Sequence, residues 1–268
     1  MSTQRMLTGS ALMNVMVAAA HKAGRGLVRD FGEIEQLQVS RKSLGDFVST
    51  ADIKAEKTII EELKKARPGY GFIIEESGVI EGEDKDNIWI IDPLDGTTNF
   101  LHGIPQFAIS IALQRKGEVI AGVVYNPVLD ELYWSEKGMG AFLNQRRLRV
   151  SGRQYIDEAL IACGTPYGRR GNSEQFVTGF RKLVGIVSGI RRFGCVALDL
   201  CFVAAGRLEG CFETNLKSWD LAAGALIVKE SGGYVCDFDG EQEYLDKGNI
   251  IAGNEPIFLE LKKNLIPM

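Results

Sequence analysis

The chain has 268 residues, of which 45 % are hydrophobic and 25 % are charged, and this composition predicts a compact globular protein with a substantial core. The net charge of −4, with both signs scattered along the chain, argues against nucleic-acid binding through phosphate contacts and against a polybasic membrane anchor. The five cysteines are odd in number and never form the close pairs that zinc sites use, so we expect reduced, buried thiols.

The N-terminal segment allows two interpretations. Arg5 and the stretch "ALMNVMVAAA" have the charge, the apolar run and the small residues of a signal peptide. Asn14 interrupts that run, and apolar residues follow helical spacing along the whole segment: Leu12, Val15, Ala19, Ala23 and Leu27. We therefore predict an amphipathic first helix and a cytoplasmic protein. No apolar stretch reaches the roughly 20 residues that a membrane span needs.

The next segments predict a helix followed by strands. Ser49 or Thr50 can cap a helix that Pro68-Gly69 ends. "GFII" and "NIWII" are short apolar runs of the strand type, and the acidic stretch "EGEDKD" between them is typical of a solvated loop. From Phe107 to Val150, alternating segments separated by turn residues predict an antiparallel meander.

From about Ile156 onward, strands and helices alternate. Helical patterns cover 173–186, 195–206, 219–231 and 255–265. The whole chain predicts a layered α/β (α+β) fold with a boundary near residues 150–156. We expect an N-terminal half, 1–153, that carries an acidic motif, and a C-terminal half, 154–268, that completes the site within one compact unit.

Acidic residues followed by small residues occur at the ends of three apolar elements. "IIEESG" places Glu75 and Glu76 after a strand, and "IIDPLDGTT" does the same with Asp92 and Asp95. "SWDLAAG" places Asp220 in the first turn of a helix. Each motif alone is also an ordinary turn or a favourable helix start. Together they predict acids that converge on one cleft, because element ends commonly meet there.

Carboxylates gathered in one cleft repel each other unless cations hold them ionised. A donor set of oxygen atoms alone suits Mg²⁺, which leaves coordination positions for a substrate phosphate. Leu94, between two of the acids, can offer its backbone carbonyl. Gly96, Thr97 and Thr98 permit close approach of backbone N–H groups to phosphate oxygens. The pattern therefore predicts a phosphoryl-transfer site.

The chain lacks the motifs of several other catalytic classes. The chain has two histidines, no G-x-S-x-G elbow and no Walker A loop, and Leu143 replaces the third glycine after Gly138-Met139-Gly140. Serine hydrolase, P-loop and dinucleotide-binding functions are therefore disfavoured.

These residues resemble the inositol monophosphatase family of Mg²⁺-dependent, lithium-sensitive phosphatases. "WIIDPLDGTTNFLH" fits the first family signature and "WDLAAGALIVKESGG" fits the second, while "DFVSTAD" and "GFIIEESG" match in the same order. The resemblance covers about residues 42 to 233. It implies an αβαβα sandwich of the inositol monophosphatase and fructose-bisphosphatase type, and a homodimer.

The resemblance also implies roles for single residues. Ligands of two Mg²⁺ ions would be Glu76, Asp92, the carbonyl of Leu94, Asp95 and Asp220. Thr97, with Asp52, would help to orient and deprotonate the metal-bound water, and Glu76 would be the third catalytic residue. The resemblance does not decide whether a third, weak Mg²⁺ site is retained, because the segment around Lys42 and Ser43 is one residue shorter than in some relatives.

The substrate pocket implied by the resemblance would be built from Gly96, Thr97, Arg191, Gly194, Cys195, Val196, Glu213 and Asp220. The implied reaction is hydrolysis of inositol monophosphate, or of a related small polyol or sugar phosphate, by metal-activated water. Alternative substrates are fructose 1,6-bisphosphate, histidinol phosphate and 3′-phosphoadenosine 5′-phosphate. A hypothesis of another class is a regulatory partner, as in a transcription complex, that uses the same fold as a binding surface.

Overall fold

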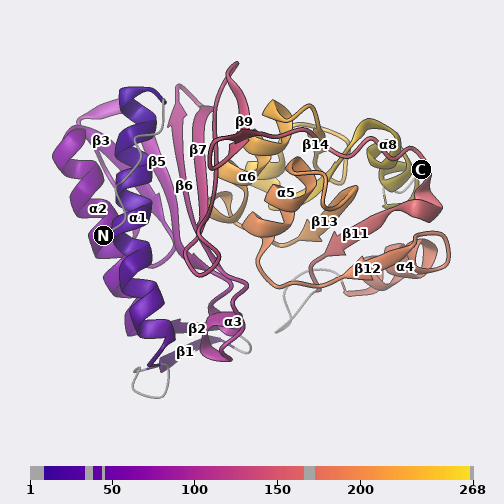
Figure 1. Cartoon of the computed structure of the whole chain (residues 1–268), viewed down its shortest axis with the longest axis horizontal. Coiled ribbons are helices and arrows are strands. Elements are labelled where there is room, and N and C mark those ends of the chain that lie inside the picture. The colour runs from indigo at the N-terminus through magenta and orange to yellow at the C-terminus, as the bar shows by residue number, and fades with distance from the viewer. Residues whose placement is uncertain (1–8, 34–38, 44–45, 166–172, 266–268) are drawn as a thin grey trace.

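Helices and sheets alternate in five layers in the computed structural model of the chain (Figure 1). The structure describes residues 9–33, 39–43, 46–165 and 173–265. Among them, no helix has both the length and the apolar character needed to cross a membrane. The five cysteines are free and buried, as predicted.

The first sheet contains the strands β3 (Tyr70–Ile74), β4 (Gly78–Ile80), β5 (Asp84–Asp95), β6 (Ala108–Arg115), β7 (Glu118–Asn126), β8 (Glu131–Glu136), β9 (Gly140–Leu143) and β10 (Arg146–Arg147). Their spatial order is β10-β9-β8-β7-β6-β5-β3-β4. Strands β5 to β10 are antiparallel neighbours in chain order, which confirms the predicted meander. Among the described strands of this sheet, only the pairing of β3 with β5 is parallel.

The second sheet contains the strands β11 (Leu160–Cys163), β12 (Gly189–Arg191), β13 (Gly210–Thr214), β14 (Tyr234–Cys236) and β15 (Asn249–Gly253). Their order is β12-β11-β13-β15-β14, with β11 parallel to both of its neighbours. A short hairpin, β1 (Val39–Ser43) with β2 (Asp46–Ser49), stands apart from both sheets. The possible third Mg²⁺ site near Lys42 and Ser43 lies outside the described side chains.

In the part of the chain that the structure describes, the three helical layers are made by the helices α1 (Ala11–Phe31), α2 (Thr50–Ala66), α4 (Ser173–Val184), α5 (Val196–Ala204), α6 (Ser218–Glu230) and α8 (Glu255–Leu265). Helices α1 and α2 cover the outer face of the first sheet, α5 and α6 fill the space between the sheets, and α8 packs on the second sheet with α4 beside it (Figure 1). The predicted αβαβα sandwich is confirmed. Shorter elements are α3 (Thr97–Leu101), η2 (Ile156–Glu158) and α7 (Tyr244–Lys247).

The helix patterns in the sequence explain where each helix lies. Helix α1 is amphipathic, as predicted, and its apolar face packs on the first sheet. Helix α2 begins after Ser49, whose hydroxyl accepts a hydrogen bond from the Ala51 amide, and ends at Ala66, shortly before Pro68. Helices α5 and α6 are apolar on nearly every side, which suits their position between two sheets.

Candidate active site

The end of β5 carries an irregularity that brings two aspartates to one side of the sheet. Asp92 pairs with Ser110 and Asp95 with Ala108, so one extra residue is inserted in β5. Residues three apart on a regular strand face opposite sides of a sheet. The bulge, which contains Pro93, therefore places both carboxylates in one cavity.

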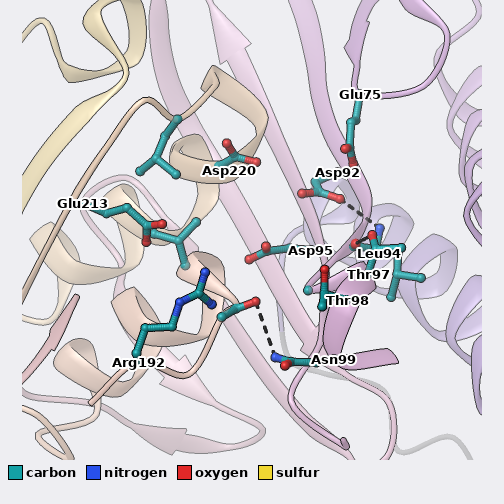
Figure 2. Close-up of a pocket in the computed structure, with 14 residues that line it drawn as sticks. Glu75, Asp92, Leu94, Asp95, Thr97, Thr98, Asn99, Arg192, Glu213 and Asp220 are labelled. Carbon is teal, nitrogen blue, oxygen red and sulfur yellow. Dashed lines mark hydrogen bonds between the residues drawn. The ribbon is translucent and has the colours of Figure 1, made fainter. Parts of the chain in front are cut away.

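This cavity, with a volume of about 340 Å³, is strongly acidic. Among the described residues that line it, five are carboxylic acids and one is a cation, Arg192. The acids come from both sheets and the middle helical layer: Glu75 after β3, Asp92 and Asp95 on β5, Glu213 on β13 and Asp220 on α6. Figure 2 shows Glu75, Asp92 and Thr97 on one side of the cavity, and Glu213 and Arg192 on the other. The side chains thus converge from segments far apart in sequence.

A backbone amide fixes one oxygen of each aspartate in the cavity. The hydrogen bonds are Leu94 N–H to Asp92 Oδ1 (2.9 Å), Ala197 N–H to Asp95 Oδ2 (2.8 Å) and Lys217 N–H to Asp220 Oδ2 (2.7 Å). Asp220 is the third residue of α6, and its bond to the residue before the helix satisfies an amide at the helix start. Each carboxylate is therefore oriented by the backbone rather than by a neighbouring cation.

The acids in the cavity are held in an environment that disfavours their charged forms. Burial raises the pKa of Asp92 well above its ordinary value, and the charges of Glu75 and Asp95 raise it further. Burial is also the main cause that raises the pKa of Asp95 and of Asp220. Asp95 and Asp220 keep some contact with solvent through the cavity, but the surrounding protein removes most of their water. A bound cation would relieve this repulsion.

Thr97 and Asp52 lie beside the acids as a hydrogen-bonded pair. The Thr97 hydroxyl is 3.2 Å from Asp52 Oδ1 and 3.0 Å from the Leu94 carbonyl oxygen, so its single proton can reach either acceptor. Burial raises the pKa of Asp52, while hydrogen bonds from Ser49 oppose that rise. The Ser49 amide and hydroxyl donate to Asp52 Oδ2 at 2.9 and 2.5 Å. Asp52 is thus fixed by the same cap that starts α2.

Glu76 was predicted as a metal ligand and catalytic residue, but the structure places its neighbour Glu75 at the cavity instead. Glu75 lines the cavity, and Glu76 does not. The backbone amides of Glu76 and Ser77 both donate to Glu56 Oε2, at 3.2 and 3.3 Å. This contact with α2 fixes the turn after β3, and consecutive side chains at a strand end point to opposite sides.

The substrate contact predicted at Arg191 is also displaced by one residue. Arg191 ends β12, and its guanidinium donates to the Ile190 carbonyl, whereas Arg192 lines the cavity. Gly194 has a φ of +80°, and a Cβ there would lie 2.3 Å from Arg192 Nη1. The glycine therefore lets Arg192 fold back toward the acids. Arg192 Nε also donates to the Thr165 hydroxyl at 3.4 Å.

The remaining predicted pocket residues fall into two groups. Gly96, Gly194, Val196 and Glu213 line the cavity. Cys195 does not: it is buried behind Asp95, and its thiol donates to Asp95 Oδ2 at 3.1 Å. Thr98, predicted with Gly96 and Thr97 to approach phosphate, also lines the cavity. Two further lining residues, Asn99 and Leu216, were not predicted. Only the "TTN" run that follows Gly96 offered a signal for Asn99.

Known proteins are similar to this chain in sequence. The inositol monophosphatase family matches residues 10–266. The chain belongs to this family. An inositol-1-monophosphatase of Mesorhizobium japonicum is 59 % identical over 95 % of this chain and 96 % of that protein. A Nus factor SuhB of Pseudomonas aeruginosa is 45 % identical over 96 % of each chain.

Solved structures of the inositol monophosphatase family show the same fold. The crystal structure of extragenic suppressor protein suhB from Bartonella henselae has a TM-score of 0.93 and 55 % identity, covering 96 % of this chain and 98 % of that one. The inositol monophosphatase from Anabaena has a TM-score of 0.85 and 32 % identity, over 96 % of each chain. The present chain is therefore a phosphatase, a hydrolase that acts on phosphorylated substrates.

Members of the inositol monophosphatase family are generally metal-dependent, and the donors in the cavity fit a hard cation. The donors are carboxylate and carbonyl oxygens, the ligands that Mg²⁺ prefers. Among the described residues, no three His, Cys, Asp or Glu side chains already stand close enough around one point to hold an ion. The carboxylates surround the cavity instead, as expected for like charges that repel each other.

Proposed function

We propose that the chain is a Mg²⁺-dependent phosphomonoesterase that hydrolyses inositol monophosphate or a related small polyol or sugar phosphate. The observation that carries the proposal is the cavity itself, where five acids, four of them with a pKa raised by burial, meet a glycine turn at the start of α3. Gly96 in that turn has a φ of +91°, and a Cβ there would lie 2.9 Å from the Gln106 carbonyl oxygen. Only glycine fits this turn without strain.

Two Mg²⁺ ions would be held by Glu75, Asp92, the carbonyl of Leu94, Asp95 and Asp220. When bound, they would supply positive charge that activates water and stabilises the phosphoryl group in transit. The proposal thus replaces Glu76 with Glu75 and keeps the other ligands predicted from the sequence.

The chain's own residues would guide the proton of the attacking water. If the Thr97 hydroxyl donates to Asp52 Oδ1, at 3.2 Å, its oxygen is left to accept a hydrogen bond from a water molecule in the cavity. Asp52 is fully buried and held by Ser49, so this acceptor cannot swing away. Thr97 and Asp52 would therefore orient the water toward phosphorus.

The opposite side of the cavity would bind the leaving alcohol. Burial raises the pKa of Glu213 to about 7, although the charge of Arg192 opposes the rise. Glu213 can accept a hydrogen bond from a substrate hydroxyl, and the guanidinium of Arg192 can donate to another oxygen of the substrate. A pair of this kind suits a polyol or a sugar.

The test is phosphate release by purified protein with and without Mg²⁺. We expect release only with Mg²⁺, inhibition by Li⁺, and nearly complete loss of activity in Asp95→Asn. Turnover without a metal would overturn the proposal. A panel that ranks inositol monophosphate against fructose 1,6-bisphosphate, histidinol phosphate and 3′-phosphoadenosine 5′-phosphate by kcat/KM tests the substrate, and a strong preference for the nucleotide would replace the polyol assignment.

A second candidate function is a regulatory role in a transcription complex, alongside catalysis. Several relatives at 41–45 % identity are named Nus factor SuhB. If the cell needs only binding, an inactive Asp220→Asn variant will fully restore a deletion strain. We also propose a homodimer located in the cytoplasm, which sedimentation and cell fractionation would test.

A further inference from the structure

Two donors at the start of α5 bind the carboxylate of Asp95. Asp95 Oδ2 accepts two hydrogen bonds, from the Ala197 amide at 2.8 Å and from the Cys195 thiol at 3.1 Å. A carboxylate oxygen has two lone pairs, so these donors fill Oδ2. The lone pairs that Asp95 can still offer to a cation are then those of Oδ1. The two donors therefore set which oxygen serves the cavity.

The segment that contains Asp95 and the segment that contains Cys195 are packed closely together. A Cβ on Gly96, the residue after Asp95, would lie 3.3 Å from the Cβ of Cys195. Asn99 on α3 joins the same two segments, because its side-chain amide donates to the carbonyls of Phe193 and Gln106, both at 2.7 Å. The contact between thiol and carboxylate is thus supported by packing and by hydrogen bonds around it.

A second cysteine on the same helix provides a contrast. Cys201 on α5 is as deeply buried as Cys195. Within the described part of the chain, Cys195 is the one cysteine whose thiol donates a hydrogen bond to a carboxylate. Burial alone therefore does not distinguish Cys195, but its donor contact does.

We propose that Cys195 is a positioning residue for metal binding, whose thiol keeps Asp95 turned so that Oδ1 faces the cation. The inference rests on the proposed function, because it requires that Asp95 binds Mg²⁺. Without the thiol, the Ala197 amide alone would hold Oδ2, and the carboxylate would rotate more freely. Groups that orient a metal ligand typically change metal affinity by about 10- to 100-fold when removed.

The test compares Cys195→Ala, Cys195→Ser and Cys201→Ala with the unmodified protein. Calorimetric titration gives the Kd for Mg²⁺, and thermal denaturation without metal gives the stability of each fold. We expect Cys195→Ala to raise the Kd by about 10-fold, and Cys195→Ser, whose hydroxyl still donates, to stay within about 3-fold. Cys201→Ala should lower the metal-free Tm and leave the Kd unchanged.

The outcomes separate this inference from the proposed function. If the unmodified protein binds Mg²⁺ and Cys195→Ala binds it equally well, the positioning role is overturned and the proposed function stands. Equal loss of affinity in Cys195→Ala and Cys195→Ser would also overturn it, because the donor would then not matter. Failure of the unmodified protein to bind Mg²⁺ would overturn both.

Discussion

Two clefts of nearly the same volume carry opposite charges in this molecule. The active-site cavity, about 340 Å³, is lined by five acids and one cation. A second cleft, about 330 Å³ between α1 and α2, is lined by one acid and four cations: Asp30, Lys22, Arg25, Arg29 and Lys54. Neither the volume of a cleft nor the size of its charge excess therefore distinguishes the two clefts.

The two clefts differ in how their charges are compensated. In the α1–α2 cleft, Asp30 is paired with Arg29 at 3.1 Å and with Lys54 at 3.2 Å, and the side chains of both cations are more than half exposed. Water and ion pairs thus neutralise those charges at little cost. In the active-site cavity the acids are crowded and poorly hydrated. Crowded charges removed from water, rather than cavity size, therefore distinguish the candidate active site from the other cleft.

The difference between the two clefts predicts the largest effect, a loss of activity, for Asp92→Asn. The variant should lose activity by about 100-fold or more, because a proposed Mg²⁺ ligand is neutralised. Its metal-free Tm should rise, because a buried charge that repels its neighbours is removed. Phosphate release and thermal denaturation in EDTA measure the two effects. The matched control is Asp86→Asn, an exposed acid on the same strand, which should change neither; a metal-free Tm that falls in Asp92→Asn contradicts the electrostatic account.

The next effect distinguishes adjacent acids. Glu75→Gln should lower activity at limiting Mg²⁺ by at least about 10-fold, because Glu75 faces the cavity. Glu76→Gln should remain near the activity of the unmodified protein. Mg²⁺ titrations of the initial rate measure both variants. The reverse ranking would show that the turn after β3 takes another conformation when metal binds.

These two acids also show where sequence reasoning ends. Helix and strand patterns predicted α2 with its cap, the meander and the helices of the C-terminal half, because hydrophobic period and turn residues determine those elements locally. The motif around Asp92 and Asp95 predicted the acidic cavity, since element ends converge there. Glu75 and Glu76 have identical side chains, so only the backbone of the turn, fixed by Glu56, separates them.

Two other differences between the predicted and the observed lining of the cavity have the same physical origin. Arg191 and Arg192 are neighbours with identical side chains. Arg192 reaches the cavity because Gly194 has no side chain that would collide with its guanidinium. Cys195 was expected to line the pocket, but its side chain is buried behind Asp95. Cys195 directly precedes α5, and the first turn of this helix is buried. Sequence patterns indicate that a segment contributes to a site, and tertiary contacts decide which residue does so.

A third prediction concerns the pH dependence of stability without metal. The pKa values of Asp92, Asp95 and Asp220 are raised, and that of Glu213 is raised to about 7. These four acids therefore bind protons more tightly in the folded protein than in the unfolded chain, so their contribution to stability falls as pH rises from about 4 through 7. The pKa of His21, which burial lowers, acts in the opposite direction. Glu213 alone would contribute a loss of about 3 kcal/mol across this range.

Thermal denaturation in EDTA at pH 5.5 and pH 8 measures this difference. The metal-free Tm should be higher at pH 5.5, and Glu213→Gln should reduce the gap between the two values. Saturating Mg²⁺ should raise the Tm mostly at pH 8, where the acids are ionised. A metal-free Tm that increases with pH would show that the acids are stabilised by other partners.

The smallest effect is expected in the α1–α2 cleft, with Asp30→Asn. The variant loses the charge that Arg29 and Lys54 share, and both cations can turn to water because they are largely exposed. The free energy of unfolding should fall by only about 1 kcal/mol, since exposed partners make ion pairs weak. Activity and the Kd for Mg²⁺ should not change, although Ala51 in the same cleft precedes Asp52 on α2. If the rate falls while the Kd holds, the first turn of α2 couples the cleft to Thr97, and the two clefts are then one functional unit.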